Sequence, residues 1–512
     1  MNQPHSAAPA RATQREWIGL AVIALPCMVY AMDLTVLNLA LPAIARELQP
    51  SSTQLLWIVD VYGFMVAGFL ITMGTLGDRI GRRKLLLIGA AAFGIGSAIA
   101  SFSNSAATLI AMRALLGIAG ATVAPSTLSL IRNMFHDDRQ RQFAIGVWIA
   151  SFSVGGAIGP LVGGVVLQWF SWGATFLVAV PVMALLLALG PTLLPEYKDP
   201  HAGRVDPTSV ALSLTAVLPT IYGLKQLAAD GWHPGALVFI AIGVAMGVAF
   251  VRRQARLPYP LMDIALFRNA RFSAAIAAYA LSCLAMFGVY IFIGQFLQQV
   301  LGLSPLHAGL ATVPWSLTFM VVSLLTPRLT HARRPLDVLV AGLGVSAVGF
   351  ALLALTDGPH ALALLLAATV VMSLGLAPVI TVGNEMIITA APPERAGAAS
   401  ALSETSAEFG GAVGIALFGS AGTALYRHTL ASDLPSGLSP DATAAAMATL
   451  GGALATAQAQ PGPVGDALLA VSRAAFTDAM QLSAFAAMLV VASAGVLAAR
   501  ILRTSGGVQG AR

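Results

Sequence analysis

The sequence has very little charge for its length. Asp, Glu, Lys and Arg together make up 10% of the 512 residues, whereas a soluble protein of this size carries about 25%. Cysteine is scarcer still, because the chain has only Cys27 and Cys283, which lie far apart inside apolar stretches. This spacing argues against a disulfide framework and against a zinc site. We interpret both cysteines as packing residues.

The sequence also lacks the short motifs of common enzyme classes. It contains no phosphate-binding loop, no zinc-ligand spacing and no nucleophile elbow, so neither ATP-driven nor hydrolytic chemistry is expected. We therefore expect no metal, no organic cofactor and no enzymatic activity.

Apolar residues, in contrast, are abundant. They make up 57% of the chain, and the mean hydropathy is +0.81, so lipid is the medium that suits it. The polar start, 1–16, precedes an apolar stretch that is too long for a signal-peptide core, and we interpret this stretch as a spanning helix. Apolar runs of about 20 residues predict an all-α membrane protein with fourteen spans, near 16–38, 54–77, 84–103, 107–131, 142–167, 172–194, 207–229, 235–252, 271–299, 306–327, 336–356, 360–390, 398–425 and 478–501.

The positive charges follow a membrane topology. With the N-terminus in the cytoplasm, all but five of the 28 Lys and Arg residues fall on cytoplasmic segments, as the positive-inside rule predicts. We expect a multi-pass protein of the cell inner membrane with both termini in the cytoplasm. The basic residues then face anionic lipid, which argues against a nucleic-acid partner despite the formal charge of +6. The exceptions are Arg46, Lys225, Arg427 and Arg473 outside and Arg113 within a span.

Two segments of the chain resemble one another. Residues 151–164 read SFSVGGAIGPLVGG and residues 406–419 read SAEFGGAVGIALFG. The first segment lies in the fifth predicted helix, and the second lies in the fifth helix of a six-helix set that begins at the ninth. This repeat predicts two six-helix bundles with a two-helix insert between them, and internally repeated bundles are common in transporters.

We therefore divide the chain into a first bundle over 1–195, an insert over 196–256 and a second bundle over 257–512. The second bundle contains a long Ala-rich connector on the outer side, 426–476. We expect a short helical hairpin or a loose flap there. A functional loop and a tolerated insertion both remain open.

Four stretches carry recognisable motifs. The loop between the second and third helices reads GTLGDRIGRRK (74–84), and the fifth helix contains GGAIGPLVGG (155–164). The fourth helix reads RALLGIAGA (113–121), and the first reads DLTVLNLALP (33–42). They resemble the signatures of the major facilitator superfamily, and the last resembles its fourteen-helix drug:proton antiporters. In the fourth helix, Leu116 stands where the family usually has Gln.

The resemblance implies a gate in the loop between the second and third helices. A cluster of charges on a Gly-rich turn can break and re-form as two bundles rock, and so can favour one conformation. The alternative is that the positive charges only set the topology. The residues of this predicted gate are Gly74, Asp78, Arg79, Gly81 and Arg82.

The fourth and fifth helices carry two further implied roles. Gly159 and Pro160 would bend and pack the fifth helix so that exchange is favoured over uptake, unless they form only a small-residue packing face. Arg113 would act in a proton relay or in gating, because a charge inside a span is costly and usually functional. Its alternative is to extend to the outer interface.

Acidic residues inside the predicted spans are the main functional candidates, because a carboxylate in lipid is expensive. Glu404 and Glu408 share one helix face, and two neighbouring carboxylates in a medium of low dielectric constant disfavour joint ionisation. One of them is therefore expected to bind and release a proton near neutral pH. Asp60 lies near an outer helix end and could be solvated there. The full set is Asp33, Asp60, Glu385, Glu404 and Glu408.

The resemblance implies coupling roles for Asp33, Glu404 and Glu408. A lipophilic cation and a proton would compete for one carboxylate, so that proton entry drives export by alternating access of a monomer. Thr35 and Asn38 are expected to bond near Asp33. Aromatic faces that could attract the cation, if they are not plain core residues, belong to Tyr30, Trp57, Tyr62, Trp148, Phe287 and Tyr290.

Other functions remain open. Export of a cellular metabolite or of a self-made antibiotic would use the same fold. An anionic substrate would need Lys or Arg in the cavity, and only Arg113 is available within the spans. A membrane sensor would not need several buried carboxylates. Proton-coupled peptide uptake lacks its Glu-x-x-Glu-Arg signature in the first helix.

Overall fold

The computed structural model of the chain describes residues 11–50, 52–198, 206–230, 234–258, 260–262, 264–391, 396–460 and 462–506. Helices dominate, and no strand occurs in these ranges. The first helices are α1 (Gln14–Leu48), α2 (Ser52–Ile80), α3 (Arg82–Ser101), α4 (Ala106–Gly120), α5 (Val123–Met134), α6 (Asp138–Trp169), α7 (Ala174–Leu177) and α8 (Ala179–Leu193). Two more follow, α9 (Pro207–Asp230) and α10 (Pro234–Gln254). The rest are η1 (Ile264–Arg268), α11 (Ala270–Gln295), η2 (Phe296–Val300), α12 (Pro305–Ala332), α13 (Pro335–Ala354), η3 (Gly358–His360), α14 (Ala361–Thr389), α15 (Ala396–Ser432), α16 (Pro440–Ala448), α17 (Leu450–Ala459) and α18 (Pro463–Gly506).

Thirteen of the described helical segments are long and apolar enough to cross a membrane. They coincide with thirteen of the predicted spans, and the remaining one, predicted over 142–167, lies in the 32-residue helix α6. Large apolar side chains on the outer faces are exposed, such as Ile95 at 61% and Val244 at 56%. Such a surface suits lipid rather than water. The prediction of an all-α, multi-pass membrane fold is confirmed.

Two predicted spans are each divided into two helices. The fourth consists of α4 and α5, and the sixth consists of α7 and α8. Pro125 and Pro181 explain the breaks, because a proline has no N–H to donate to the carbonyl four residues earlier. Those carbonyls belong to Ala121 and Leu177, which lie at the two breaks.

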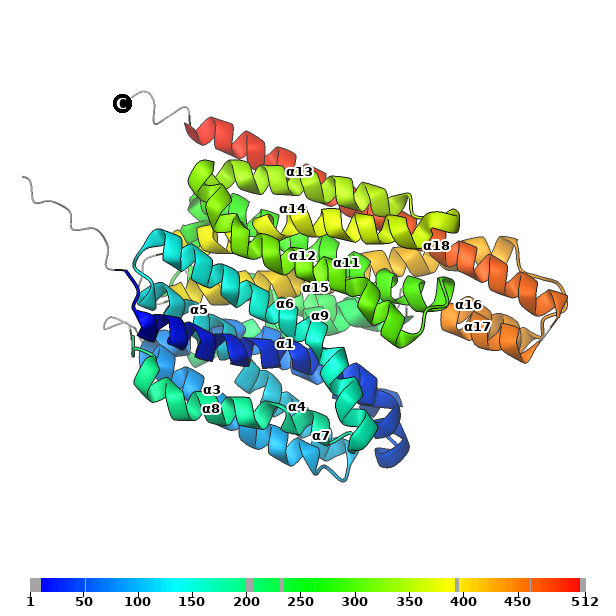
Figure 1. Ribbon diagram of the computed structural model, residues 1–512, viewed down its shortest axis with the longest axis horizontal. Helices are drawn as coiled ribbons and strands as arrows, with labels where there is room; N and C mark the ends of the chain where they lie inside the picture. The colour runs from blue at the N-terminus through cyan, green and yellow to red at the C-terminus, as the bar shows by residue number, and fades with distance from the viewer. Residues whose placement is uncertain are drawn as a thin grey trace, which may run out of the picture.

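The helices form two groups that lie side by side (Figure 1). We call α1–α8 the first half and α11–α18 the second half. The start of α1 and the end of α18 lie at one end of the bundle, the terminal end. At the opposite hairpin end, α16 and α17 fill the connector predicted as a hairpin or flap (Figure 1). With 44 residues and about 1.5 Å per residue, α18 is longer than a membrane core of about 30 Å.

The insert lies against both halves. Helix α9 packs on α2 and on α15, while α10 packs on α9. At the base of the insert, Arg253 Nε donates to Asp206 Oδ2 over 2.6 Å. The Arg253 guanidinium and the Ser209 hydroxyl hold the pKa of Asp206 below its ordinary value. The domain boundaries predicted above stay a prediction. Helix α9 contacts both halves, and α10 covers α9.

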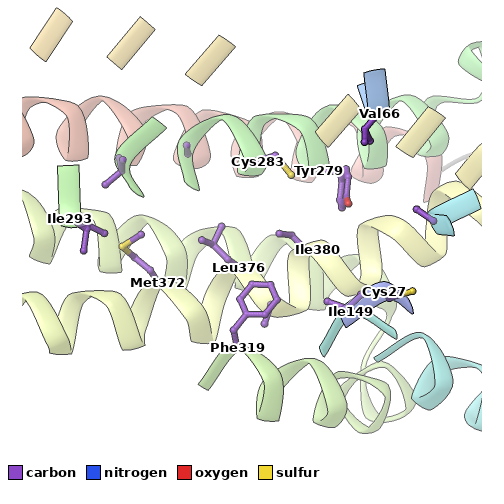
Figure 2. Close-up of a cluster of buried hydrophobic side chains, with 14 of the residues drawn as sticks. Cys27, Val66, Ile149, Tyr279, Cys283, Ile293, Phe319, Met372, Leu376 and Ile380 are labelled. Atoms are coloured by element: carbon purple, nitrogen blue, oxygen red, sulfur yellow. The ribbon is translucent and has the colours of Figure 1, made fainter. Parts of the chain in front are cut away.

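The core of the second half contains apolar side chains of α11, α12 and α14, together with side chains of α13, α15 and α18. Figure 2 shows Phe319 of α12 pointing towards Leu376 and Met372 of α14. Cys283 of α11 lies buried in this core, Cys27 of α1 is buried in the first half, and both are free thiols. This agrees with their interpretation as packing residues.

Candidate functional site

A buried ion pair joins α1 and α4. Arg113 Nη1 donates to Asp33 Oδ2, and the exposed fractions of the two side chains are 1% and 12%. The Nε of Arg113 also donates to the carbonyl of Ile58 over 3.1 Å. The guanidinium carbon lies 4.6 Å from the centre of the Tyr62 ring, within the range of a cation–π contact. Arg113 is therefore held inside the first half and does not extend to the outer interface.

Two glycines of the fourth-helix motif explain how these groups come together. A Cβ on Gly117 would lie 2.5 Å from the Tyr62 carbonyl oxygen. A Cβ on Gly120 would lie 3.0 Å from the Tyr62 hydroxyl and 3.3 Å from the Tyr30 ring. Side chains at these positions would separate α4 from α1 and α2. The small residues of this motif thus allow Arg113 to reach both Asp33 and Tyr62.

A row of aromatic rings continues from the ion pair through the first half. Tyr30 lies 5.9 Å from Tyr62 and 5.6 Å from Phe152, measured between ring centres. Phe152 lies 4.8 Å from Trp148, whose indole donates to the Thr127 hydroxyl over 2.9 Å. Of these rings, only Phe152 was not predicted from the sequence. Its position four residues after Trp148 places it on the same face of α6 and could have revealed it.

The two acids of α15, Glu404 and Glu408, are both half-buried. The charge of Glu404 acts on Cys27 and Tyr30 of α1 and on Tyr279 of α11. The charge of Glu408 acts on Tyr30 and Tyr62. Helix α15, which carries both acids, packs on α2 and α5 of the first half and on α11 of the second, so both acids lie on a helix between the two halves. Glu404 also experiences the negative charge of Glu408.

Three of the predicted acids occupy successive depths. Counted at about 1.5 Å per residue from the terminal ends of their helices, Glu404 lies about 12 Å in, Glu408 about 18 Å and Asp33 about 28 Å. Asp33 also lines a small pocket between α1 and the α7–α8 region. The three acids thus span about 16 Å along the helix direction, roughly half of a membrane core of about 30 Å.

Other predicted residues lie elsewhere. The side chains of Asp60 and Asn38 are outside the described part of the structure. Thr35 donates to the carbonyl of Met32 over 3.0 Å and so turns back onto its own helix. The other predicted aromatics are more exposed: Trp57 stacks on Tyr222 of the insert, Tyr290 packs against Trp315 of α12, and Phe287 is 42% exposed.

The predicted gate loop holds a buried ion pair at the terminal end. Arg82 Nη2 donates to Asp78 Oδ1, and the Arg82 side chain is fully buried. Gly81 has a φ of 111°, a conformation that favours glycine. Arg79 is exposed, whereas Gly74 is buried. The charges predicted to cluster at this loop do so, although Arg79 does not join them.

Glu196, which follows α8, bonds to this loop and was not predicted from the sequence. Its carboxylate accepts from the backbone N–H groups of Arg83 and Lys84, both over 3.1 Å, at the start of α3. An acid at this position stabilises a helix N-terminus. A Cβ on Gly81 would lie 2.6 Å from Glu196 Oε1. The turn at Gly81 is therefore packed against Glu196, a residue more than a hundred positions away in the sequence.

Glu385 does not join the other acids but connects the two halves near the terminal end. Its Oε1 accepts from Gln142 Nε2 of α6 over 2.9 Å, and Gln142 Oε1 accepts from Thr330 of α12 over 3.0 Å. Nearby, Arg132 of α5 donates to the carbonyls of Ile388 and Ala391 at the end of α14, over 2.6 and 3.2 Å. We call these four residues, Arg132, Gln142, Thr330 and Glu385, the terminal lock. They hold the halves together at that end.

The two similar glycine segments perform equivalent packing. A Cβ on Gly155 or Gly159 of α6 would overlap α1, at Met28 and Thr35. A Cβ on Gly410 or Gly414 of α15 would overlap α11, at Ala280 and Leu284. Each half thus presses its fifth spanning helix against its first. The side chain of Pro160 is outside the described part of the structure.

No group of three His, Cys, Asp or Glu side chains within the described ranges is arranged to hold a metal ion. The described site consists of carboxylates, a guanidinium and aromatic rings. Two helical halves with charged groups enclosed between them are the architecture of secondary transporters.

The chain belongs to the Major Facilitator Superfamily, whose sequence pattern matches residues 23–415. It is 46% identical to the multidrug efflux pump LfrA of Mycolicibacterium smegmatis, over 95% of this chain and 96% of that protein. It is 32% identical to the methyl viologen resistance protein SmvA of Salmonella typhimurium, over 94% and 98% of the two chains. These relatives confirm the family predicted from the motifs.

Solved structures of low sequence identity share the fold. The human organic anion transporter MFSD10 superposes with a TM-score of 0.61 at 15% identity, over 93% of this chain and 99% of that one. A bacterial homolog of the human lysosomal transporter Spinster, in an inward-facing and unoccupied conformation, superposes with a TM-score of 0.59 at 18% identity, over 96% and 98%.

Proposed function

We propose that this protein exports lipophilic cationic drugs, antiseptics and dyes across the cell inner membrane in exchange for protons. The observation that carries the proposal is the position of Glu404 and Glu408 on α15, a helix that packs on both halves, where their charges reach aromatic residues of each half. A carboxylate among aromatic rings suits a lipophilic cation, because the rings and the negative charge both attract it.

The same carboxylate suits a proton. A buried acid tolerates either a bound proton or a paired cation better than its own bare charge. Drug and proton therefore compete for the same carboxylate. This competition couples the two fluxes without any conformational coupling between distant sites. Each proton that enters down the electrical gradient contributes about 2.3 kcal/mol per 100 mV.

Alternating access would proceed around these acids. With the terminal end in the cytoplasm, as the charge distribution predicts, the terminal lock closes the cytoplasmic side. Opening of the lock would admit the drug, and its closure would expose the acids to external protons. Names of relatives support a drug as the substrate, since one is a multidrug efflux pump and another a methyl viologen resistance protein.

Export of a self-made antibiotic is the second candidate. It is favoured by similarity to the tetracenomycin C resistance and export protein of Streptomyces glaucescens, 31% identical over 79% of this chain. The charge of the described site favours the first candidate, because its buried cation, Arg113, is already paired with Asp33. An anionic product would find little to bind there.

Ethidium transport in everted membrane vesicles tests the proposal. We expect uptake that requires a pH gradient in the wild type and that falls at least tenfold in Asp33→Asn, Glu404→Gln and Glu408→Gln. Asp441→Asn, which removes an exposed acid of α16, is the matched control and should transport normally. Uptake without a gradient, or full activity in all three site variants, would refute proton coupling through these acids.

A further inference from the structure

Tyr62 was predicted to offer its ring to a substrate, but its place in the fold points to another task. The side chain is completely buried, with an exposed fraction of 0%. Within the described part of the structure its hydroxyl has no hydrogen-bond partner. A buried hydroxyl that makes no hydrogen bond is costly, and such a group in a native protein calls for an explanation.

The surroundings of Tyr62 come from four helices. Its ring faces the Arg113 guanidinium of α4 and packs edge-on against Phe93 of α3, 6.5 Å between ring centres. On α1, Asp33 acts electrostatically on the hydroxyl, and the ring of Tyr30 lies beside the ring of Tyr62. Helix α2, which carries Tyr62, packs on α15, and the charge of Glu408 on α15 reaches the same hydroxyl. The Tyr62 hydroxyl thus lies within the electrostatic influence of one acid from each half, Asp33 and Glu408.

We propose that the Tyr62 hydroxyl carries protons between Asp33 in the first half and Glu408 in the second. The inference rests on the proposed proton exchange and adds to it a route. Protonated Asp33 gives its proton to the Tyr62 oxygen, directly or through one ordered water, while the hydroxyl proton of Tyr62 passes to the Glu408 carboxylate. Tyr62 is unchanged at the end, Asp33 is again a carboxylate and Glu408 is a neutral acid.

The ion pair gives this transfer a direction. A proton on Asp33 leaves the buried Arg113 charge without its counter-charge, which is strongly unfavourable. Passing the proton to Glu408 restores the pair and also removes the repulsion between Glu408 and Glu404. The ring of Tyr62 keeps Arg113 in place throughout, so the ring and the hydroxyl have separate roles.

Tyr62→Phe tests the proposal, because it removes the hydroxyl and keeps the ring. The protein is purified and reconstituted into liposomes that contain a pH-sensitive dye, and tetraphenylphosphonium is the probe. We expect proton flux driven by tetraphenylphosphonium to fall at least tenfold, while the Kd for the same cation changes less than twofold. Tyr222→Phe is the matched control, since Tyr222 accepts from Gln226 in the insert and should leave flux and binding unchanged.

Two results would overturn the inference. One is normal coupling in Tyr62→Phe, and the other is a loss of cation affinity as large as the loss of flux, which would make Tyr62 a substrate contact. Absence of flux in the wild type would instead refute the proposed function itself. The melting temperature guards against misfolding: we expect Tyr62→Phe to melt at or above the wild-type value, and Tyr62→Leu, which also removes the ring from Arg113, to melt below it.

Discussion

The two halves pack their helices alike and treat their acids differently. In each half, a pair of glycines four residues apart presses the fifth spanning helix against the first. In the first half, the acid beside this contact is Asp33, and Arg113 neutralises it. In the second half, Glu404 has the like charge of Glu408 as its neighbour.

This difference separates scaffold from function. Glycine allows two helix backbones to pack closely whatever charges lie nearby, so both halves can use the same contact. The charge arrangement differs between the halves. An acid that is already paired with an arginine gains little from an incoming cation, whereas two acids that repel one another are stabilised by it. The described ion pair of the first half is electrically satisfied, whereas under the proposed function the like-charge pair of the second half attracts a proton or a cationic drug.

Breaking the ion pair should have the largest effect. Arg113→Ala leaves Asp33 buried without its cation, and removal of one partner of a buried pair typically costs about 3–5 kcal/mol. Because Cys27 and Cys283 are buried and free, their labelling by a thiol-reactive dye during heating reports the loss of stability. The double variant Asp33→Asn with Arg113→Gln should recover most of this loss without recovering proton coupling. A stable Arg113→Ala protein would contradict the role given to the pair.

Overfilling the glycine contacts should have an intermediate effect in both halves. Gly159→Ala and Gly414→Ala force a Cβ into the facing helix, and overpacking typically costs about 1–3 kcal/mol. Gly156→Ala and Gly294→Ala are the controls, since a Cβ at either position has no neighbour within 4 Å. Melting temperatures of the four variants measure the difference. If only one half were sensitive, the two contacts would not be equivalent.

Loosening the terminal lock should have a smaller effect on stability and a visible one on conformation. Glu385→Ala removes the acceptor of the 2.9 Å bond from Gln142, a loss of about 0.5–1.5 kcal/mol. A single cysteine introduced at Ser323, a buried position of α12 beside Gly146 of α6, should then react faster with a membrane-impermeant maleimide. The comparison is made in a background where Cys27 and Cys283 are serine. Unchanged labelling would show that the lock does not hold the halves closed.

Relieving the like-charge pair should have the smallest effect, and one of opposite sign. Glu404→Gln removes the negative charge beside Glu408, and like charges at this spacing destabilise even exposed helices by about 0.2–0.5 kcal/mol. We expect the melting temperature to rise slightly, more at pH 8.5 than at pH 6 because more of the acid is ionised there. If the melting temperature of Glu404→Gln fell as far as that of Arg113→Ala, the acids of the two halves would not differ in the way described.

Much of the fold followed from residue patterns that act locally. Apolar runs defined the spans, and Pro125 and Pro181 already marked the two helix breaks that the span count overlooked. Acids within apolar runs pointed to Asp33, Glu404 and Glu408, because a charge in lipid needs a reason wherever the chain folds.

The remainder depended on contacts between distant parts of the chain. Glu385 meets Gln142 across 243 positions, and nothing local to either residue announces the pairing. Tyr62 and Tyr290 are alike in sequence terms, yet one is fully buried and the other is 51% exposed. Such assignments require the arrangement of the halves, which hydropathy does not specify.

Proton release on binding tests the central claim most directly. Purified protein in weakly buffered detergent solution near neutral pH is mixed with tetraphenylphosphonium, and a pH indicator records the protons set free. If drug and proton occupy one counter-charge in the second half, the wild type should release close to one proton per bound cation and Glu408→Gln should release far fewer. Saturable binding with no proton released by the wild type would contradict the account.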